Sequence, residues 1–188
     1  YMRYDTIDRS NNRILLGIGS NQKQVVSKKG GKKVAFVVQD ELWYYDYQKS
    51  NMYKVFSFEG EDYRDSRNNY QKHAIQIMKM KNNGDIAFLV YGYMNRGKHE
   101  GENGISVYQY TASDQKIEEL GFIPTQIQYD MMKNDIKKGA FLSGSGQFYF
   151  YLDGAVYQVD LDSGKSKILA KNITDDMTVI SENGMLAL

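Results

Sequence analysis

Apolar and polar side chains alternate in short runs along most of this chain, and polar turns separate the runs. Four segments share one arrangement: a tyrosine-rich alternating run, a turn rich in small polar residues, and a second alternating run. They occupy residues 3–16, 42–56, 105–120 and 155–169. Each segment predicts a β-hairpin, because successive side chains of a strand point to opposite faces and such turns reverse the chain.

A second type of hairpin alternates with the first along the chain. Its copies occupy residues 25–38, 75–90, 140–152 and 179–188, each with glycine in its turn. The strand that follows the turn is nearly continuous in apolar residues, as in Ile-Ala-Phe-Leu-Val at 86–90. A strand of that composition is covered on both faces, so we expect it to lie between neighbouring sheets.

A hairpin of the second type and the hairpin of the first type that follows it together form a four-stranded antiparallel meander. The separation of the equivalent residues Ile14 and Val55 matches the roughly 40–50 residues of a β-propeller blade. Their counterparts Ile117 and Ile168 follow at longer separations, which two inserted loops explain. We therefore predict an all-β fold with four-stranded antiparallel blades, that is, a partial or small β-propeller.

The repeat predicts a single propeller region over residues 1–188 and sets its internal boundaries. Complete blades are expected at 24–57, 74–122 and 137–170, with half-blades at 1–20 and 178–188. The two half-blades either pair to close a four-bladed ring or belong to a longer propeller. The second alternative is favoured, because the sequence ends inside an apolar run and propellers have four to eight blades.

One hairpin resembles a known kind of bacterial repeat. Residues 153–165, Asp-Gly-Ala-Val-Tyr-Gln-Val-Asp-Leu-Asp-Ser-Gly-Lys, are similar to the inner hairpin of quinoprotein-like and YncE-like propeller blades. The tryptophan that often marks the quinoprotein repeat is absent from the matching positions, so the resemblance implies no quinone site. Residues 90–101 also resemble a segment of propeller-containing proteins of clostridia, which implies a bacterial setting and no particular activity.

Composition narrows the classes of partner. The net charge of +1, from 24 basic and 23 acidic residues, argues against nucleic-acid binding, which needs a basic excess. No apolar stretch reaches the ~20 residues of a membrane helix, so this segment is not expected to insert into a membrane. The absence of cysteine excludes disulfides and zinc–thiolate sites and fits an extracytoplasmic bacterial protein, although a cytosolic protein could share it.

The longer insertion, residues 91–104, is the predicted ligand-binding or partner-binding loop. Long loops in compact domains are uncommon and are often functional, and glycine lets this one turn tightly. The alternative is an exposed hairpin loop with internal salt bridges. The candidate binding residues combine aromatic rings, both charge signs and a titratable imidazole: Tyr91, Tyr93, Arg96, His99, Glu100 and Glu102.

No cofactor or metal site is predicted. Residues 59–67 carry four carboxylates, but their spacing is not that of a calcium loop, so a solvated linker is favoured. His73 and His99 are the only histidines, and a zinc site needs three or four ligands.

Two further segments have a structural and a functional interpretation. Residues 123–138 break the strand pattern, and the spacing of their apolar side chains suggests a helical turn in a packed connector, with a strand as the alternative: Ile127, Met131, Met132 and Ile136. Trp43 lies in a tyrosine-rich run that could form an aromatic platform for a sugar or peptide. A strand packed on both faces is the favoured interpretation.

The leading functional hypothesis is a non-enzymatic, extracytoplasmic binding, sensing or scaffold module. It would contact a protein, peptide or glycan through loops on one propeller face and pack against other blades of a longer protein. The alternative is a carbohydrate-active propeller enzyme with carboxylates at the central axis. The enzyme predicts a pocket that contains two or more carboxylates, whereas the binding module predicts an aromatic and charged patch at residues 91–104.

Overall fold

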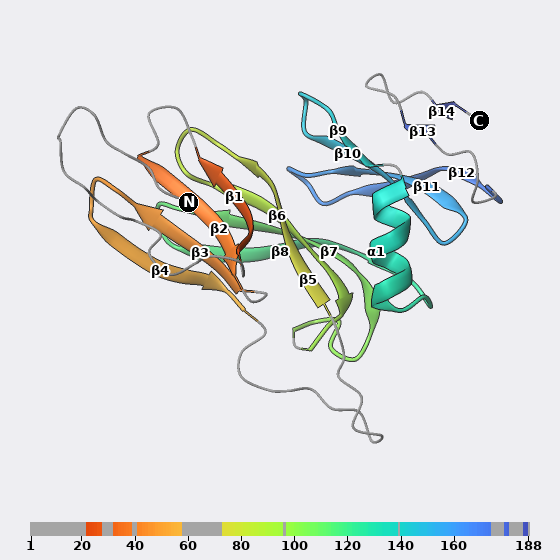
Figure 1. The fold of residues 1–188 in the computed structure, drawn as a ribbon, viewed down its shortest axis with the longest axis horizontal. Helices are drawn as coiled ribbons and strands as arrows, with labels where there is room; N and C mark the ends of the chain where they lie inside the picture. Colours follow the sequence, from red (N-terminus) through yellow and green to blue (C-terminus); the bar gives the residue numbers. More distant parts are fainter. Residues whose placement is uncertain are drawn as a thin grey trace.

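The computed structural model describes residues 22–27, 32–38, 41–57, 73–95, 97–138, 140–173, 179–180 and 186–187. They form three four-stranded antiparallel sheets and a short two-stranded one, which confirms the all-β class (Figure 1). The first sheet contains β1 (Gln22–Ser27), β2 (Lys33–Val38), β3 (Glu41–Asp46) and β4 (Asn51–Phe56).

The second and third sheets repeat this order of strands. The second contains β5 (His73–Met80), β6 (Ile86–Tyr93), β7 (Asn103–Thr111) and β8 (Lys116–Pro124). The third contains β9 (Ala140–Leu142), β10 (Gln147–Leu152), β11 (Ala155–Asp160) and β12 (Ser166–Lys171). Each strand pairs with its neighbours in the sequence, so every sheet is a simple meander.

The chain continues into a hairpin of β13 (Val179–Ile180) and β14 (Leu186–Ala187). The predicted half-blade at 1–20 and the acidic segment at 59–67 lie outside the described residues. The division of the chain into three blades and two half-blades therefore stays a prediction. No helix in the described part of the chain is long and apolar enough to cross a membrane.

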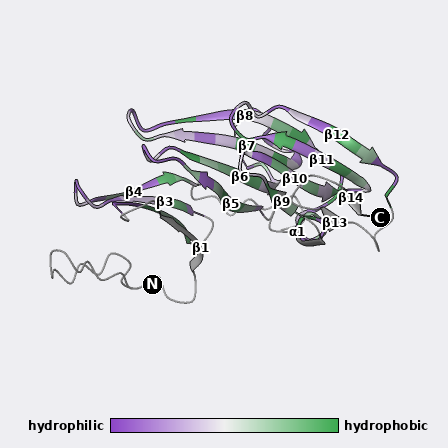
Figure 2. Cartoon of the chain, turned by 90° about the horizontal axis from the view of Figure 1, so that it is seen from above, coloured by the Kyte–Doolittle hydropathy of each residue, from purple (hydrophilic) through white to green (hydrophobic). Residues whose placement is uncertain are grey.

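The sheets bury their faces against one another, as the alternation predicts. Strand β6 shows this most clearly, because its side chains pack in both directions: Phe88 and Val90 join the core shared with the first sheet, and Ala87 and Leu89 join the core shared with the third. All four are at most 5% exposed. Apolar residues follow the strands and hydrophilic residues the turns (Figure 2).

A helix, α1 (Tyr129–Lys138), fills the space between the second and third sheets, where it packs against β6 and β10 (Figure 1). This confirms the helical connector and excludes the strand alternative. Met132 is 0% and Ile136 7% exposed, whereas Met131, which was expected to pack, is 59% exposed. A helix of 3.6 residues per turn puts positions 132 and 136 on one face, and position 131 points away from it.

Two of the described hairpins of the first type share an aspartate at the end of their first strand, and all three share a residue with left-handed φ near the end of the turn. Asp46 ends β3 and Asp160 ends β11, and each carboxylate accepts backbone N–H groups of the turn that follows. The turns return to a strand after a residue with left-handed φ: Ser50, Gln115 and Gly164. An aspartate that accepts the backbone N–H groups ahead of it favours a tight turn, which explains its position at the end of the strand.

Asp160→Ala is expected to lower the free energy of unfolding by about 1 kcal/mol at neutral pH. The Ser163 hydroxyl, the Ser163 and Asp162 amides and Gln147 donate to the carboxylate and lower its pKa. This contribution is present above the pKa of an unfolded aspartate, about 4, and is lost as the pH falls through the lower folded pKa. Urea unfolding of the wild type and the variant at pH 7 and pH 3 measures this contribution. An equal difference in their free energies of unfolding at both pH values would contradict the expected pH dependence.

Candidate functional site

The predicted binding loop is a compact turn between β6 and β7. Met94 N donates to Glu102 O and Gly101 N to Met94 O, both at 2.9 Å, which closes the loop at its base. Gly97 and Gly101 have φ values of +91° and +89°, a conformation that glycine adopts without steric cost. The loop is therefore ordered by its own backbone.

His99 connects this loop to β8. Its ring stacks on Phe122 with 3.9 Å between centroids, and its Nδ1 lies 3.1 Å from Glu102 Oε1. Its Nε2 lies 3.8 Å from Glu119 Oε1, which also accepts a 2.7 Å hydrogen bond from Ser106 Oγ. Histidine and glutamate of the loop thus meet, as the charges suggested, but much of the imidazole is covered by the neighbouring strand.

Tyr91 lies apart from His99. Tyr91 stacks on Tyr129 of α1 at 5.8 Å and packs against the core between the second and third sheets. Phe122 and the stacked His99 lie instead on the side of the first sheet. The predicted residues are therefore divided between the two faces of the second sheet.

Three other residues complete the predicted set. Tyr93, at the end of β6, is half-buried, Glu100 is exposed, and Arg96 lies outside the described residues. A binding role for the set as a whole stays a prediction.

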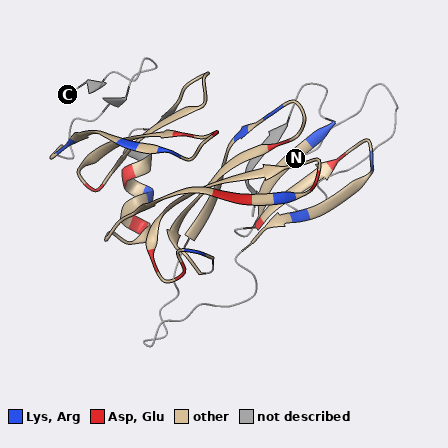
Figure 3. Cartoon of the chain, turned by 180° about the vertical axis from the view of Figure 1, so that it is seen from behind, with Lys and Arg blue, Asp and Glu red and all other residues tan. Residues whose placement is uncertain are grey.

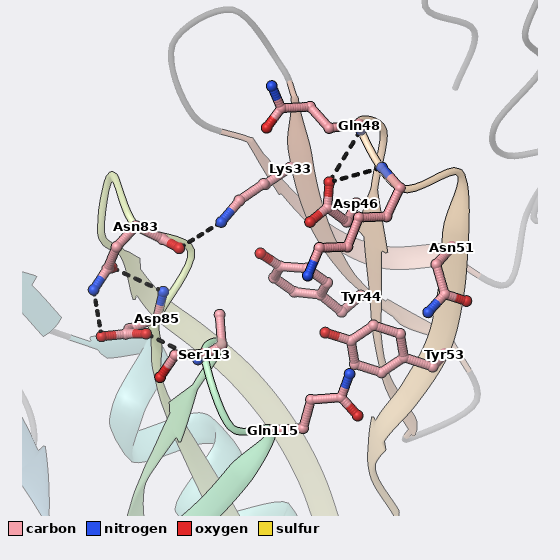
Figure 4. A pocket seen from close by; sticks show the side chains of 12 residues that line it. Lys33, Tyr44, Asp46, Gln48, Asn51, Tyr53, Asn83, Asp85, Ser113 and Gln115 are labelled. Atoms are coloured by element: carbon pink, nitrogen blue, oxygen red, sulfur yellow. Dashed lines mark hydrogen bonds between the residues drawn. The ribbon is translucent and has the colours of Figure 1, made fainter.

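A pocket that the sequence did not predict lies between the first two sheets (Figure 4). It has a volume of about 280 Å³ and opens among the turns that follow β3, β5 and β7. Every lining residue except Ala112 carries a polar group, and the tyrosine rings add apolar surface: Lys33, Tyr44, Asp46, Gln48, Lys49, Asn51, Tyr53, Asn83, Asp85, Ala112, Ser113 and Gln115.

Hydrogen bonds hold the charged groups of the pocket in place. Asp46 Oδ1 accepts the N–H groups of Gln48 at 3.0 Å and Lys49 at 3.4 Å. Across the pocket, Asp85 accepts Ala112 N at 2.9 Å on one oxygen and Asn83 Nδ2 at 2.7 Å on the other.

Lys33 joins the two sides of the pocket. Its Nζ donates to Asn83 O at 2.6 Å, so the first sheet is hydrogen-bonded to the turn between β5 and β6 (Figure 4). The pocket walls are therefore fixed by bonds within each sheet and by two bonds between the sheets, this one and the bond between the Tyr53 and Tyr110 hydroxyls.

Tyr44 forms the buried part of the pocket. Its side chain is 1% exposed, and its hydroxyl has no hydrogen-bond partner among the described residues. The adjacent Tyr53 and Tyr110 hydroxyls bond to each other, across the two sheets. The Tyr44 ring lies 5.4 Å from the Tyr53 ring and 5.6 Å from the Tyr110 ring. A buried hydroxyl without a partner is unfavourable, so it marks a place where a bound group would be stabilised.

Stability is expected to fall as the pH rises above about 10, the pKa of an unfolded tyrosine. Burial raises the pKa of Tyr44, Tyr53 and Tyr110, and the neighbouring tyrosines and carboxylates raise that of Tyr44 further. Because the folded state holds these protons after the unfolded state has lost them, their stabilisation is complete below pH 10 and is lost above it. Unfolding in urea at pH 9 and pH 11 tests the sign, and a Tyr44→Phe, Tyr110→Phe variant should show a smaller fall.

The aromatic platform suggested at Trp43 lies on the other face of the first sheet. Trp43 packs beside Val34, Phe36 and Tyr45, and its Nε1 donates to Glu41 at 3.0 Å. The favoured interpretation, a strand packed on both faces, stays a prediction for that face, because the cluster around Trp43 comes from its own sheet. Neighbouring Tyr44 points the opposite way, into the pocket, because strand residues alternate between faces.

Charge and metal-binding groups complete the description of the surface. Lys and Arg lie among Asp and Glu along the described strands and turns (Figure 3). Among the described residues, no cluster of three or more metal-binding side chains occurs.

No known protein family and no curated protein matches the sequence. Solved structures match in fold, and the dipeptidyl peptidase 4 of Porphyromonas gingivalis aligns with a TM-score of 0.53 at 10% identity, over 96% of this chain and 29% of that one. A putative 6-phosphogluconolactonase of Bacteroides fragilis aligns with a TM-score of 0.44 at 10% identity, over 82% of this chain and 40% of that one. An oligogalacturonate lyase in complex with manganese aligns with a TM-score of 0.42 at 12% identity, over 74% of this chain and 33% of that one.

These likenesses concern the fold alone. Together with the three four-stranded meanders, the likeness to the dipeptidyl peptidase confirms the predicted fold class, a partial or small β-propeller. The chain spans less than half the length of each of these three structures.

Proposed function

We propose that this chain is part of a non-enzymatic binding module whose ligand occupies the pocket between the first and second sheets. The observation that carries the proposal is Tyr44, whose hydroxyl is buried in a polar pocket and lacks a partner among the described residues. Ligand sites combine a concave shape with a few fixed polar groups, and this pocket has both. Its volume of about 280 Å³ suits a small ligand or one terminal unit of a larger one.

Binding is favoured over catalysis because both carboxylates already have a structural role. Asp46 accepts the backbone of its own turn, and Asp85 accepts a backbone and a side-chain donor. A general acid or base must exchange a proton with a substrate, and a carboxylate that holds a turn together is poorly placed to do so. The alternative, a carbohydrate-active enzyme, rests on the presence of these two carboxylates on opposite sides of one pocket.

The setting of the proposal follows from the sequence. We place the chain among bacterial propeller repeats of the quinoprotein-like and YncE-like kind, outside the cytoplasm, as part of a longer propeller. The partner would be a protein, peptide or glycan.

The experiment uses Gly84→Ala to displace two residues that line the pocket, Tyr44 and Lys33. A Cβ at Gly84 would overlap the Tyr44 hydroxyl and would stand within 3.0 Å of the Lys33 ammonium. Gly97→Ala is the matched control, because Gly97 has a similar φ, +91° against +98°, and a Cβ there meets nothing within 4 Å. Thermal unfolding is measured with a panel of amino acids, short peptides, neutral saccharides and acidic saccharides.

We expect at least one class to raise the melting temperature of the wild type and of Gly97→Ala, but not that of Gly84→Ala. A panel without any effect would overturn the proposal, as would equal shifts in Gly84→Ala and Gly97→Ala. Chemical conversion of the bound compound, followed by chromatography, would favour the enzyme instead.

A further inference from the structure

We infer that the ligand of this pocket is a neutral, hydroxyl-rich group, namely a saccharide residue of a glycan. The inference rests on the proposed function and adds the chemical class of the ligand. It follows from the charge balance of the pocket, from the hydrogen-bonding groups that remain uncommitted, and from the tyrosine rings beside the buried hydroxyl.

The charges that line the pocket cancel. Lys33 and Lys49 carry positive charge, and Asp46 and Asp85 carry negative charge. A site for a phosphate, a sulfate or an acidic sugar would need a cationic excess, because charge-assisted bonds supply most of the affinity for such anions. A site for a cation would need the opposite excess.

The charged groups are also largely engaged, which argues against a zwitterionic amino acid. Both oxygens of Asp85 accept donors, and one oxygen of Asp46 accepts two backbone N–H groups. Lys33 donates to Asn83 O across the pocket. An amino acid would have to pair with the charges that remain, the second oxygen of Asp46 and the Lys49 ammonium, whereas a neutral ligand needs no charged partner.

The uncommitted groups suit hydroxyls. Four exposed residues around the pocket make no side-chain hydrogen bond within the described part of the chain: Gln48, Asn51, Ser113 and Gln115. Carboxamides and a serine hydroxyl both donate and accept, and so does each hydroxyl of a sugar. Gln48 and Asn51 come from the first sheet and Ser113 and Gln115 from the second, so a ligand would be held from both sides (Figure 4).

The tyrosines provide the apolar part of the site. Tyr53 is half-buried and its ring lies 5.4 Å from that of Tyr44, so the two rings form one continuous wall (Figure 4). A sugar ring has an apolar face of C–H groups that packs on an aromatic ring, while the hydroxyls at its edge find polar partners. The Tyr44 hydroxyl, at the buried end of this wall, can donate to one sugar hydroxyl or accept from it.

The experiment compares Tyr44→Phe with Tyr45→Phe in the full chain. Both remove one phenolic oxygen from the same strand, but Tyr45 packs on the opposite face, beside Trp43. Tyr44→Phe is expected to fold at least as well as the wild type, because it removes a buried hydroxyl that has no partner. The probes are methyl glycosides of neutral hexoses and N-acetylhexosamines, free amino acids, and inorganic phosphate, titrated against the ¹⁵N-labelled protein and followed by NMR.

We expect at least one neutral glycoside to shift amide signals of the residues around the pocket, with an affinity that changes less than twofold with added salt. Tyr44→Phe should weaken this binding about tenfold, and Tyr45→Phe should leave it unchanged. Equal affinities in the two variants would overturn the inference. If amino acids or phosphate bind and neutral glycosides do not, the saccharide assignment is overturned and the binding function stands. If no probe and no member of the earlier panel binds, both are overturned.

Discussion

Phe88→Ala is expected to lower the free energy of unfolding by about 4 kcal/mol. Phe88 is 0% exposed at the centre of the core between the first two sheets. Its ring lies 5.3 Å from Phe56 of the first sheet and stacks on Tyr108 of its own sheet at 5.2 Å. Truncation removes contacts on both sides and leaves a cavity, since rigid sheets cannot collapse fully into the space.

Urea unfolding followed by tyrosine fluorescence measures this loss. Met52→Ala is the control, because Met52 is 50% exposed on β4 and its truncation should change stability by less than about 0.5 kcal/mol. Similar losses in the two variants would mean that the first two sheets do not share a core in solution.

Gly121→Ala is expected to cost about 3 kcal/mol, because it separates the second sheet from the third. A Cβ at Gly121 would overlap the carbonyl oxygen of Gly164, which belongs to the turn between β11 and β12. The obstacle is backbone, so no side-chain rotation relieves it. The reciprocal change, Gly164→Ala, would press on the backbone of Leu120 and would also place alanine at a φ of +70°.

Substitutions at two other glycines separate the steric overlap from the penalty of a positive φ. Gly97→Ala carries only the penalty of a positive φ, about 1 kcal/mol, because a Cβ there meets nothing within 4 Å. Gly144→Ala carries neither penalty and should match the wild type. Denaturant midpoints should therefore fall in the order Gly144→Ala, Gly97→Ala, Gly121→Ala, and a Gly121→Ala midpoint near that of Gly144→Ala would contradict the close approach of the two sheets.

The repeat of hairpins was predictable because each one depends on neighbouring residues. The alternation in 42–56 sets which side chains share a face, and the Asp-Gly pair at 153–154 sets a tight turn with positive φ at both residues. The burial of both faces of β6 followed from its unbroken apolar run. The helix at 129–138 was visible as a break in the strand pattern, but its exposed Met131 shows that the helical face could not be assigned by apolar character alone.

The predicted binding loop shows a limit of reasoning along the chain. Tyr91 and His99 are close in sequence, yet they lie on opposite faces of the second sheet, against different cores. Their separation follows from the two-residue period of β6 and from the fold of the loop over β8. A segment rich in chemically active residues need not form one surface.

The pocket could not be found from the sequence, because its walls come from turns of two sheets. Asp46 and Asp85 are 39 positions apart in the chain and face one pocket only because the two sheets pack together. Local patterns of apolar and polar residues therefore determined the strands, the turns and the propeller class of this protein. Only the tertiary structure decided which polar ends meet and left the Tyr44 hydroxyl without a partner among the described residues, since contacts between sheets depend on packing distances that no local pattern contains.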